Sequence, residues 1–373
     1  MDTRQRIKAV LHYEKCDKLP VVHFSYWTQT VEKWAREGHI PRDIMETGDS
    51  GAIFGYVNRA LGWDQDFGNA VSFFNMGLFP GFAPKVVREL ADGSKHVMNG
   101  DGVTELHKPG AVSIPAEIEH LLKDRASWEE HYLHRVRFTM ERYNDDPALK
   151  AVVEDPGRDF HLGLHAGSIY GTIRNWIGVV GTSYMMADDP GLLKEIIDAY
   201  ADMQYKCVEY TLENVTDKFD AASMWEDICF NYGPLINPEL FEKWCGPHYA
   251  RLRRLFEAHG IDIIYLDCDG CIDKLVPVWV ENGVNTMFPI EVGTWGGSYA
   301  DFRNMCGKKV RGVGGMDKRV FAYDRKAVDR EIERLKPIID LGGFIPCPDH
   351  RIAPDAVYEN VQYYVDRMQN YKL

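Results

Sequence analysis

The chain has 373 residues, of which 45% are hydrophobic and 27% are charged, a composition typical of a globular enzyme with a large core. Its 43 Lys and Arg residues are outnumbered by 56 Asp and Glu residues, which gives a formal net charge of -13 at pH 7. Such an acidic chain is repelled by nucleic-acid phosphates and by anionic lipid, and its apolar runs all fall short of the roughly 20 residues that a membrane helix needs. Composition therefore argues against nucleic acid as a partner and against a membrane span.

The N-terminal segment turns directly into a charged, helix-like sequence and lacks the apolar region and small-residue cleavage site of a secretory signal. We therefore expect a cytoplasmic protein. The 8 cysteines are too dilute for a disulfide scaffold, so most should be buried free thiols. No linker, charge block or long repeat divides the sequence, which favours a single domain over residues 1–373.

In the first part of the chain, a short apolar strand is expected at 19–24, with helices near 28–37 and 51–61. Between residues 85 and 107 the pattern changes to three short β runs, separated by an Asp-Gly turn and an Asn-Gly-Asp-Gly turn. Such turns are strong hairpin signals. The stretch 85–108 therefore predicts an antiparallel excursion from the main fold.

From about residue 157, apolar strands alternate regularly with helical segments. The expected strands are 160–165, 221–225, 261–266, 284–288, 310–313 and 344–346. The expected helices include 169–178, 190–215, one capped by Asn237 with Pro238 at its first position, 272–282, 299–306, 326–340 and 358–371. Repeated β-then-α units predict a parallel sheet with helices outside it, which periodicity alone leaves either open or closed into a barrel.

Acids, thiols, an imidazole or glycines follow five successive expected strands. They are Glu226 and Asp227; Asp267, Cys268 and Asp269; Glu291; Gly314, Gly315 and Asp317; and Cys347, Asp349 and His350. Because the carboxyl ends of parallel strands converge on one rim, these side chains should share a pocket. A single Asp in such a position can instead cap the following helix, but five strand ends together favour an active site.

Two of these segments invite a sharper interpretation. Cys268-Asp-Gly-Cys271 has the CxxC spacing of zinc or dithiol sites, although no second Cys/His pair accompanies it. The stretch 346–350, Pro-Cys-Pro-Asp-His, holds a thiol, an acid and an imidazole close together, with a packed thiol and a capping Asp as the alternative.

Seven segments also carry a family resemblance. They are 167–178, 225–227, 266–270, 281–284, 289–291, 314–318 and 342–350. Together they resemble the uroporphyrinogen decarboxylase superfamily, and within it the branch of corrinoid-linked methyltransferases and O-demethylases. The likeness runs in order over most of the chain. It implies an α/β fold of the (β/α)8 TIM-barrel type, with an N-terminal extension that contains the antiparallel excursion.

The resemblance also implies a metal site. Thiol-methylating members of the superfamily bind zinc through a His-x-Cys pair after one strand and a Cys after a later one. An ungapped match puts Asp267 and Asp269 at the first pair and Cys347 at the later Cys. Asp, Glu, Cys and His are all competent zinc ligands, so the implied set is Glu226, Asp267, Asp269 and Cys347, around Zn²⁺.

The function implied by the resemblance is that of the first methyltransferase of an O-demethylase system. It would move a methyl group from a methoxylated, aromatic substrate to Co(I) of a corrinoid on a partner protein. An ether oxygen leaves badly as an anion, so the site must supply a Lewis acid or a proton donor. The candidate residues are, for catalysis, His350, Glu226 and Asp269 and, for substrate binding, His23, Tyr26, Trp27, Phe288 and Glu291.

Two other functions stay open. A decarboxylase without metal or corrinoid would use the same acids for protonation, but residues 23–30 lack the arginines with which the decarboxylases grip propionates. A non-catalytic corrinoid- or porphyrin-binding protein would not need so many ionisable groups on one rim. That acidic rim favours a neutral ether as substrate, and the sequence leaves open whether the chain forms a homodimer.

Overall fold

The computed structural model describes residues 1–111 and 114–372, and a seven-stranded parallel sheet lies at its centre. Its strands are β3 (Ala70–Val71), β8 (Gly163–His165), β9 (Ala221–Trp225), β12 (Ile264–Asp267), β13 (Thr286–Ile290), β14 (Arg311–Met316) and β15 (Phe344–Pro348). Their order is β15-β14-β13-β12-β9-β8-β3. Strands such as β13 are buried along their whole length, as expected when both faces are covered. The predicted parallel α/β fold is confirmed.

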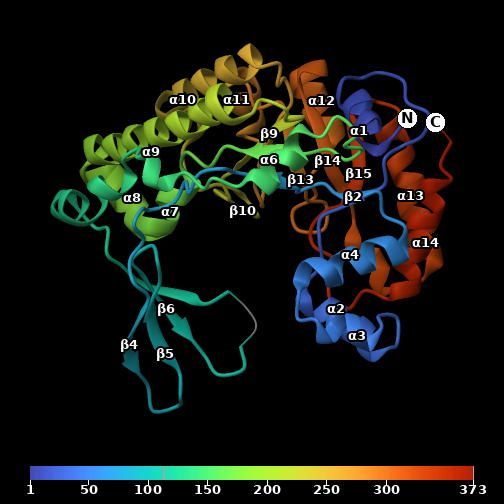
Figure 1. Cartoon of the computed structure of the whole chain (residues 1–373), viewed down its shortest axis with the longest axis horizontal. Coiled ribbons are helices and arrows are strands. Elements are labelled where there is room, and N and C mark those ends of the chain that lie inside the picture. Colours follow the sequence, from blue (N-terminus) through green and yellow to red (C-terminus); the bar gives the residue numbers. More distant parts are fainter. Residues whose placement is uncertain (112–113, 373) are drawn as a thin grey trace.

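Helices pack around this sheet (Figure 1). They are α1 (Thr3–Leu11), α6 (Pro147–Glu154), α7 (Gly171–Ile177), α8 (Val179–Asp188), α9 (Pro190–Tyr210), α10 (Pro238–Ala258), α11 (Val276–Glu281), α12 (Tyr299–Cys306), α13 (Arg325–Ile339) and α14 (Tyr358–Gln369). The start of α10 is as predicted, because the Asn237 side chain accepts the Glu239 N–H at 2.8 Å and Pro238 is the first helical residue. No helix in the described part of the chain has the length and apolar character needed to cross a bilayer.

The sheet is not closed by hydrogen bonds within the described residues. A separate parallel pair joins β1 (Val22–His23) to β2 (Gln65–Asp66), and only residues 67–69 separate β2 from β3. β1 also lies beside β15, and just beyond it the Trp27 N–H donates to the Ile352 carbonyl at 3.1 Å. The pair thus lies between the two outer strands of the sheet, but the closed eight-stranded barrel implied by the sequence is not confirmed.

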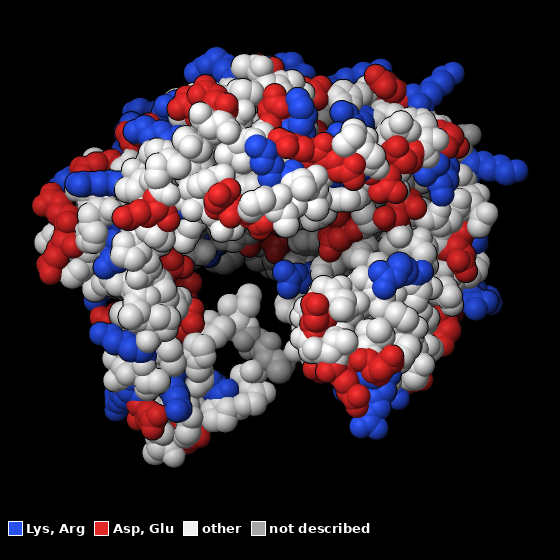
Figure 2. Space-filling model, in the orientation of Figure 1, with Lys and Arg blue, Asp and Glu red and all other residues white. Residues whose placement is uncertain are grey.

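Two extensions project from the same side of the sheet (Figure 1). One is an antiparallel sheet of β4 (Lys85–Glu89), β5 (Lys95–Met98), β6 (Val103–His107) and β7 (Ala116–His120), which adds a fourth strand to the predicted three. The other consists of α2 (Thr28–Arg36), α3 (Arg42–Glu46) and α4 (Ser50–Leu61). Figure 2 shows that the molecular surface is hollowed between them.

Candidate active site

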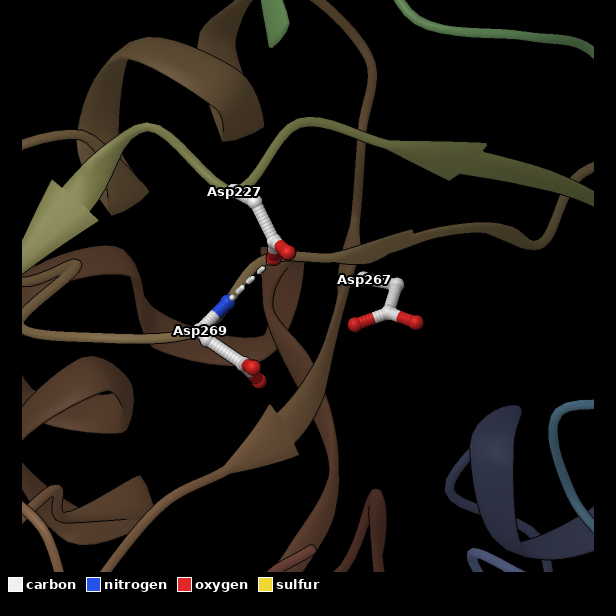
Figure 3. Close-up of side chains that lie close together, drawn as sticks. All are labelled: Asp227, Asp267 and Asp269. Atoms are coloured by element: carbon white, nitrogen blue, oxygen red, sulfur yellow. Dashed lines mark hydrogen bonds between the residues drawn. The ribbon is translucent and has the colours of Figure 1, made fainter. Parts of the chain in front are cut away.

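Three aspartates come together at the carboxyl edge of the sheet (Figure 3). Asp227 follows β9, Asp267 is the last residue of β12, and Asp269 lies two residues beyond it. One carboxylate oxygen of each lies within 4.8 Å of the others. The Asp269 N–H donates to Asp227 Oδ1 at 3.0 Å, and Asp227 has a φ of 47°, a left-handed conformation that Asp tolerates. We call these three residues the acid cluster.

The acid cluster is partly buried and concentrates negative charge. Burial and the charges of Asp227 and Asp269 raise the pKa of Asp267 well above its ordinary value. Burial and the Asp269 charge also raise the pKa of Asp227. Asp269 Oδ1 is buried without a hydrogen-bond partner among the described residues. Close carboxylates with a free oxygen are the kind of donor set that a divalent cation neutralises, so the cluster fits a metal ion.

His350 links the acid cluster to a group of aromatic side chains. Its Nε2 lies 3.3 Å from Asp269 Oδ2. On the other side, its ring stacks on Trp27 with centroids 6.2 Å apart and meets the Phe24 ring edge-on at 5.4 Å. Phe24 in turn contacts Phe288 at 4.7 Å. The predicted residues His350, Trp27 and Phe288 therefore lie together with Phe24, which the sequence reasoning missed. We call Trp27, Phe24 and Phe288 the aromatic wall.

Glu226 lies next to Asp227 in the chain, but its side chain has a structural role. It is 0% exposed, and its carboxylate accepts the N–H groups of Ile169 at 2.9 Å, Tyr170 at 3.0 Å and Gly171 at 2.5 Å, together with the Tyr249 hydroxyl. These bonds tie the start of α7 to the end of β9. Because both oxygens of Glu226 are engaged in this way, Asp227 and not Glu226 belongs to the acid cluster.

Three more predicted residues are buried in the core and do not belong to the acid cluster. His23 is 1% exposed and packs against Tyr26 and Trp63, and burial lowers its pKa to about 3. Tyr26 is equally buried and donates its hydroxyl proton to Asn58 Oδ1 at 2.8 Å. Cys347 is 0% exposed within β15, and burial raises its pKa well above the ordinary value, which disfavours the thiolate that a metal requires.

Glu291 lies behind the acid cluster, where it holds the loop that carries Asp269. Its carboxylate accepts the Gly270 N–H at 2.6 Å and the Thr294 hydroxyl at 3.0 Å, and burial raises its pKa. Cys268 and Cys271 are free thiols, the first buried and the second half-buried. Among the described residues, the acid cluster is the one group of three or more His, Cys, Asp or Glu side chains close enough to hold a metal. The CxxC spacing therefore does not form such a site.

Asp66 is a further acid at a strand end, and its strand, β2, is too short to leave a sequence pattern. Burial raises the pKa of its carboxyl group from 3.8 to about 6. The folded state therefore holds this proton more tightly than the unfolded chain does, and Asp66 costs stability progressively as the pH rises from about 4 to about 6.

Asp66→Asn is accordingly expected to raise the thermal unfolding midpoint at pH 7.5, by an amount equivalent to roughly 1–3 kcal/mol, and to have little effect near pH 4. The amide oxygen of Asn can still accept the Gly68 N–H, now bound at 3.0 Å. Thermal melts of both proteins across this pH range test the prediction, with the exposed Asp43→Asn as a control. A difference that does not change with pH would contradict it.

Comparisons with known proteins bear on the fold. No protein-family model matches the chain, and no curated protein matches it in sequence. Among solved structures, a methyltransferase from Methanosarcina mazei matches with a TM-score of 0.58 and 16% identity, over 99% of this chain and 98% of that chain. A protein described as a vitamin-B12-independent methionine synthase from Listeria monocytogenes matches with a TM-score of 0.36 and 14% identity, over 63% of this chain and 70% of that chain. The first match shows a fold shared along the whole length.

Proposed function

We propose that this protein is the first methyltransferase of an O-demethylase system, which moves a methyl group from an aryl methyl ether to Co(I) of a corrinoid on a partner protein. The observation that carries the proposal is the contact of His350 with both Asp269 and the aromatic wall. This arrangement puts a proton donor between a charged centre and a surface for an aromatic ring. The fold shared with a methyltransferase over 99% of the chain supports methyl transfer as the reaction.

We further propose that β1, β2 and β3 complete an eight-stranded barrel around this site. β2 and β3 would form one interrupted strand, since β2 pairs with β1 and β3 pairs with β8. β1 lies beside β15 on the other side. In such a barrel, Asp66, the acid cluster and His350 all belong to the rim where the strands end, which is where active sites of this fold lie.

The acid cluster would hold the metal ion, with His350 as its nearest imidazole neighbour. When bound there, a divalent cation such as Zn²⁺ supplies Lewis-acid stabilisation of the charge that develops on the ether oxygen. Glu226 and Cys347 are left out of this revised set, because one is engaged by backbone N–H groups and the other is fully buried.

The protein's own residues account for the remaining steps. Trp27 and Phe24 bind the aryl ring and keep water from the reacting bond, while Phe288, which is 1% exposed, supports Phe24 from the core. The methyl group passes to the partner's Co(I), and the electron pair of the broken carbon–oxygen bond stays on the oxygen. His350, as the imidazolium paired with Asp269, gives that oxygen a ring proton and becomes neutral imidazole, so that the product leaves as a phenol. Asp269, 3.3 Å from Nε2, orients the imidazole for this transfer.

The direct test is to incubate the purified protein with a panel of methoxyarenes and a reduced corrinoid protein. Formation of methylcobalt, followed by absorbance, together with an equal amount of phenol supports the proposal. Release of CO₂ from an aryl acid without added corrinoid, and no methylcobalt with any ether, would overturn it in favour of a decarboxylase.

Metal binding is tested separately, through its effect on the thermal stability of the protein. After treatment with a chelator, addition of Zn²⁺ is expected to raise the thermal unfolding midpoint, with a stabilisation of about 2.7 kcal/mol when free metal reaches about 100 times its dissociation constant. Asp267→Asn should abolish this rise, because it removes a carboxylate of the acid cluster. Asp273→Asn, an exposed acid in the following loop, should retain it. A rise of equal size in both variants would place the metal elsewhere.

A further inference from the structure

A cavity of about 610 Å³ opens beside the aromatic wall. Its lining includes Phe24, Asn58, Asp66, Asn69 and Arg351. Phe24 is also a member of the aromatic wall, and Arg351 directly follows His350 in the chain. The cavity therefore adjoins the candidate active site, yet its polar lining has no role in the mechanism derived above.

Arg351 is the unexplained cation of this cavity. It is exposed, and among the described residues it has no hydrogen-bond or ion-pair partner on its side chain. Its guanidinium carbon lies 5.7 Å from the centre of the Trp27 ring. It lines the cavity together with Asp66, so its charge faces the cavity. A guanidinium that stacks on an aromatic ring keeps its N–H groups free for a ligand in the ring plane.

On the basis of the proposed function, we infer that Arg351 and this cavity bind an anionic group of the ether substrate, namely a carboxylate on its aromatic ring. Arginine donates two parallel N–H bonds to a carboxylate, a geometry that fixes orientation as well as charge. Asn58 can add a donor from its amide nitrogen, because its Oδ1 already accepts the Tyr26 hydroxyl. Arg351 and His350 both lie against the Trp27 ring, at 5.7 Å and 6.2 Å from its centre, so a ring whose carboxylate is held by Arg351 lies near His350.

The inference changes the expected substrate. The acids of the rim alone favour a neutral ether, because they would repel an anion. Arg351 offsets that repulsion at one place, in the cavity that it lines together with Asp66, and so admits a single carboxylate there while polyanions stay excluded.

The test compares two probes of the same shape, 4-methoxybenzoate and the neutral 4-methoxybenzamide, by titration calorimetry with the full-length protein. The wild type is expected to bind the benzoate at least about tenfold more tightly, as befits a charge-assisted hydrogen-bonded pair. Arg351→Gln should remove this preference and leave binding of the amide unchanged. Arg330→Gln, an exposed arginine on α13 away from the cavity, should behave as the wild type.

Equal affinity of the wild type for both probes, including no measurable binding of either, would overturn the inference, as would an equal loss for both probes in Arg351→Gln. A methyl-transfer assay with the same probes separates it from the proposed function. Transfer from both ethers that Arg351→Gln leaves unaltered would overturn only the anion site. An Arg351-dependent preference for the benzoate, without transfer from any ether, would support the anion site and overturn the proposed function.

Discussion

Asp269→Asn is expected to slow methyl transfer from an aryl methyl ether by about 10²–10³-fold, the effect typical of removing one group that stabilises charge in the transition state. Asp269 belongs to the acid cluster and is also the carboxylate next to His350 Nε2. In the proposed mechanism, the substitution therefore removes a metal ligand and the contact that orients His350 together. The backbone bond from the Asp269 N–H to Asp227 is retained, so the loop should keep its shape.

Initial rates of methylcobalt formation at saturating ether, measured beside thermal melts, check this expectation. The matched control is Asp273→Asn, which changes an exposed acid four residues further along the chain. Asp269→Asn should lose activity while its unfolding midpoint stays at or above that of the wild type, because one repelling charge is gone. Full activity in a folded Asp269→Asn protein would remove the acid cluster from the mechanism.

Glu226→Ala is expected to have the largest effect on stability, about 3–5 kcal/mol, because it strips buried donors of their acceptor. The N–H groups of Ile169, Tyr170 and Gly171 would lose their partner in the buried interior. The backbones are also closely packed here, since the Cβ of an alanine at Gly171 would lie 1.9 Å from the Glu226 carbonyl oxygen.

Chemical unfolding of Glu226→Ala and of Glu226→Gln, with the exposed Glu239→Ala as the control, measures this loss. Glu226→Gln keeps the size of the side chain but turns an amide NH₂ toward backbone donors, so an intermediate loss is expected. If Glu226→Gln were as stable as the wild type but inactive in methyl transfer, Glu226 would be a catalytic or metal-binding group, as the sequence interpretation has it.

Much of the fold could be predicted because its strands are uniformly apolar and its turns are distinctive. The buried strands β9 and β13 stand out between helical segments, and Asp-Gly turns mark the antiparallel extension. Strand β7 was missed because its alternation of Ala116 and Ile118 with acidic residues covers only five residues, which lie mostly exposed. The two-residue strands β1 and β2 are too short for any periodicity, so the closure of a barrel could not be predicted from pattern.

The candidate site was predictable in place but not in detail. The ends of parallel strands identified Asp267, Asp269 and His350, which the structure brings close together. The choice of Glu226 over Asp227 depended on the direction of two successive side chains, and the left-handed φ of Asp227 sets that direction. No sequence period encodes such a backbone angle. Cys347 is buried because β15 is covered on both faces, with all five of its residues buried, and a strand end read from sequence does not show where that cover stops.

The hydrogen bonds of Glu226 also provide a way to monitor the strand end that carries Asp227. The amide protons of Ile169, Tyr170 and Gly171 all point at this carboxylate, one residue before Asp227. Such protons exchange with solvent deuterium only when the segment opens. Their exchange rates, read by NMR or mass spectrometry, would therefore follow the integrity of the strand end that carries Asp227, in the absence of any ether, metal or corrinoid partner.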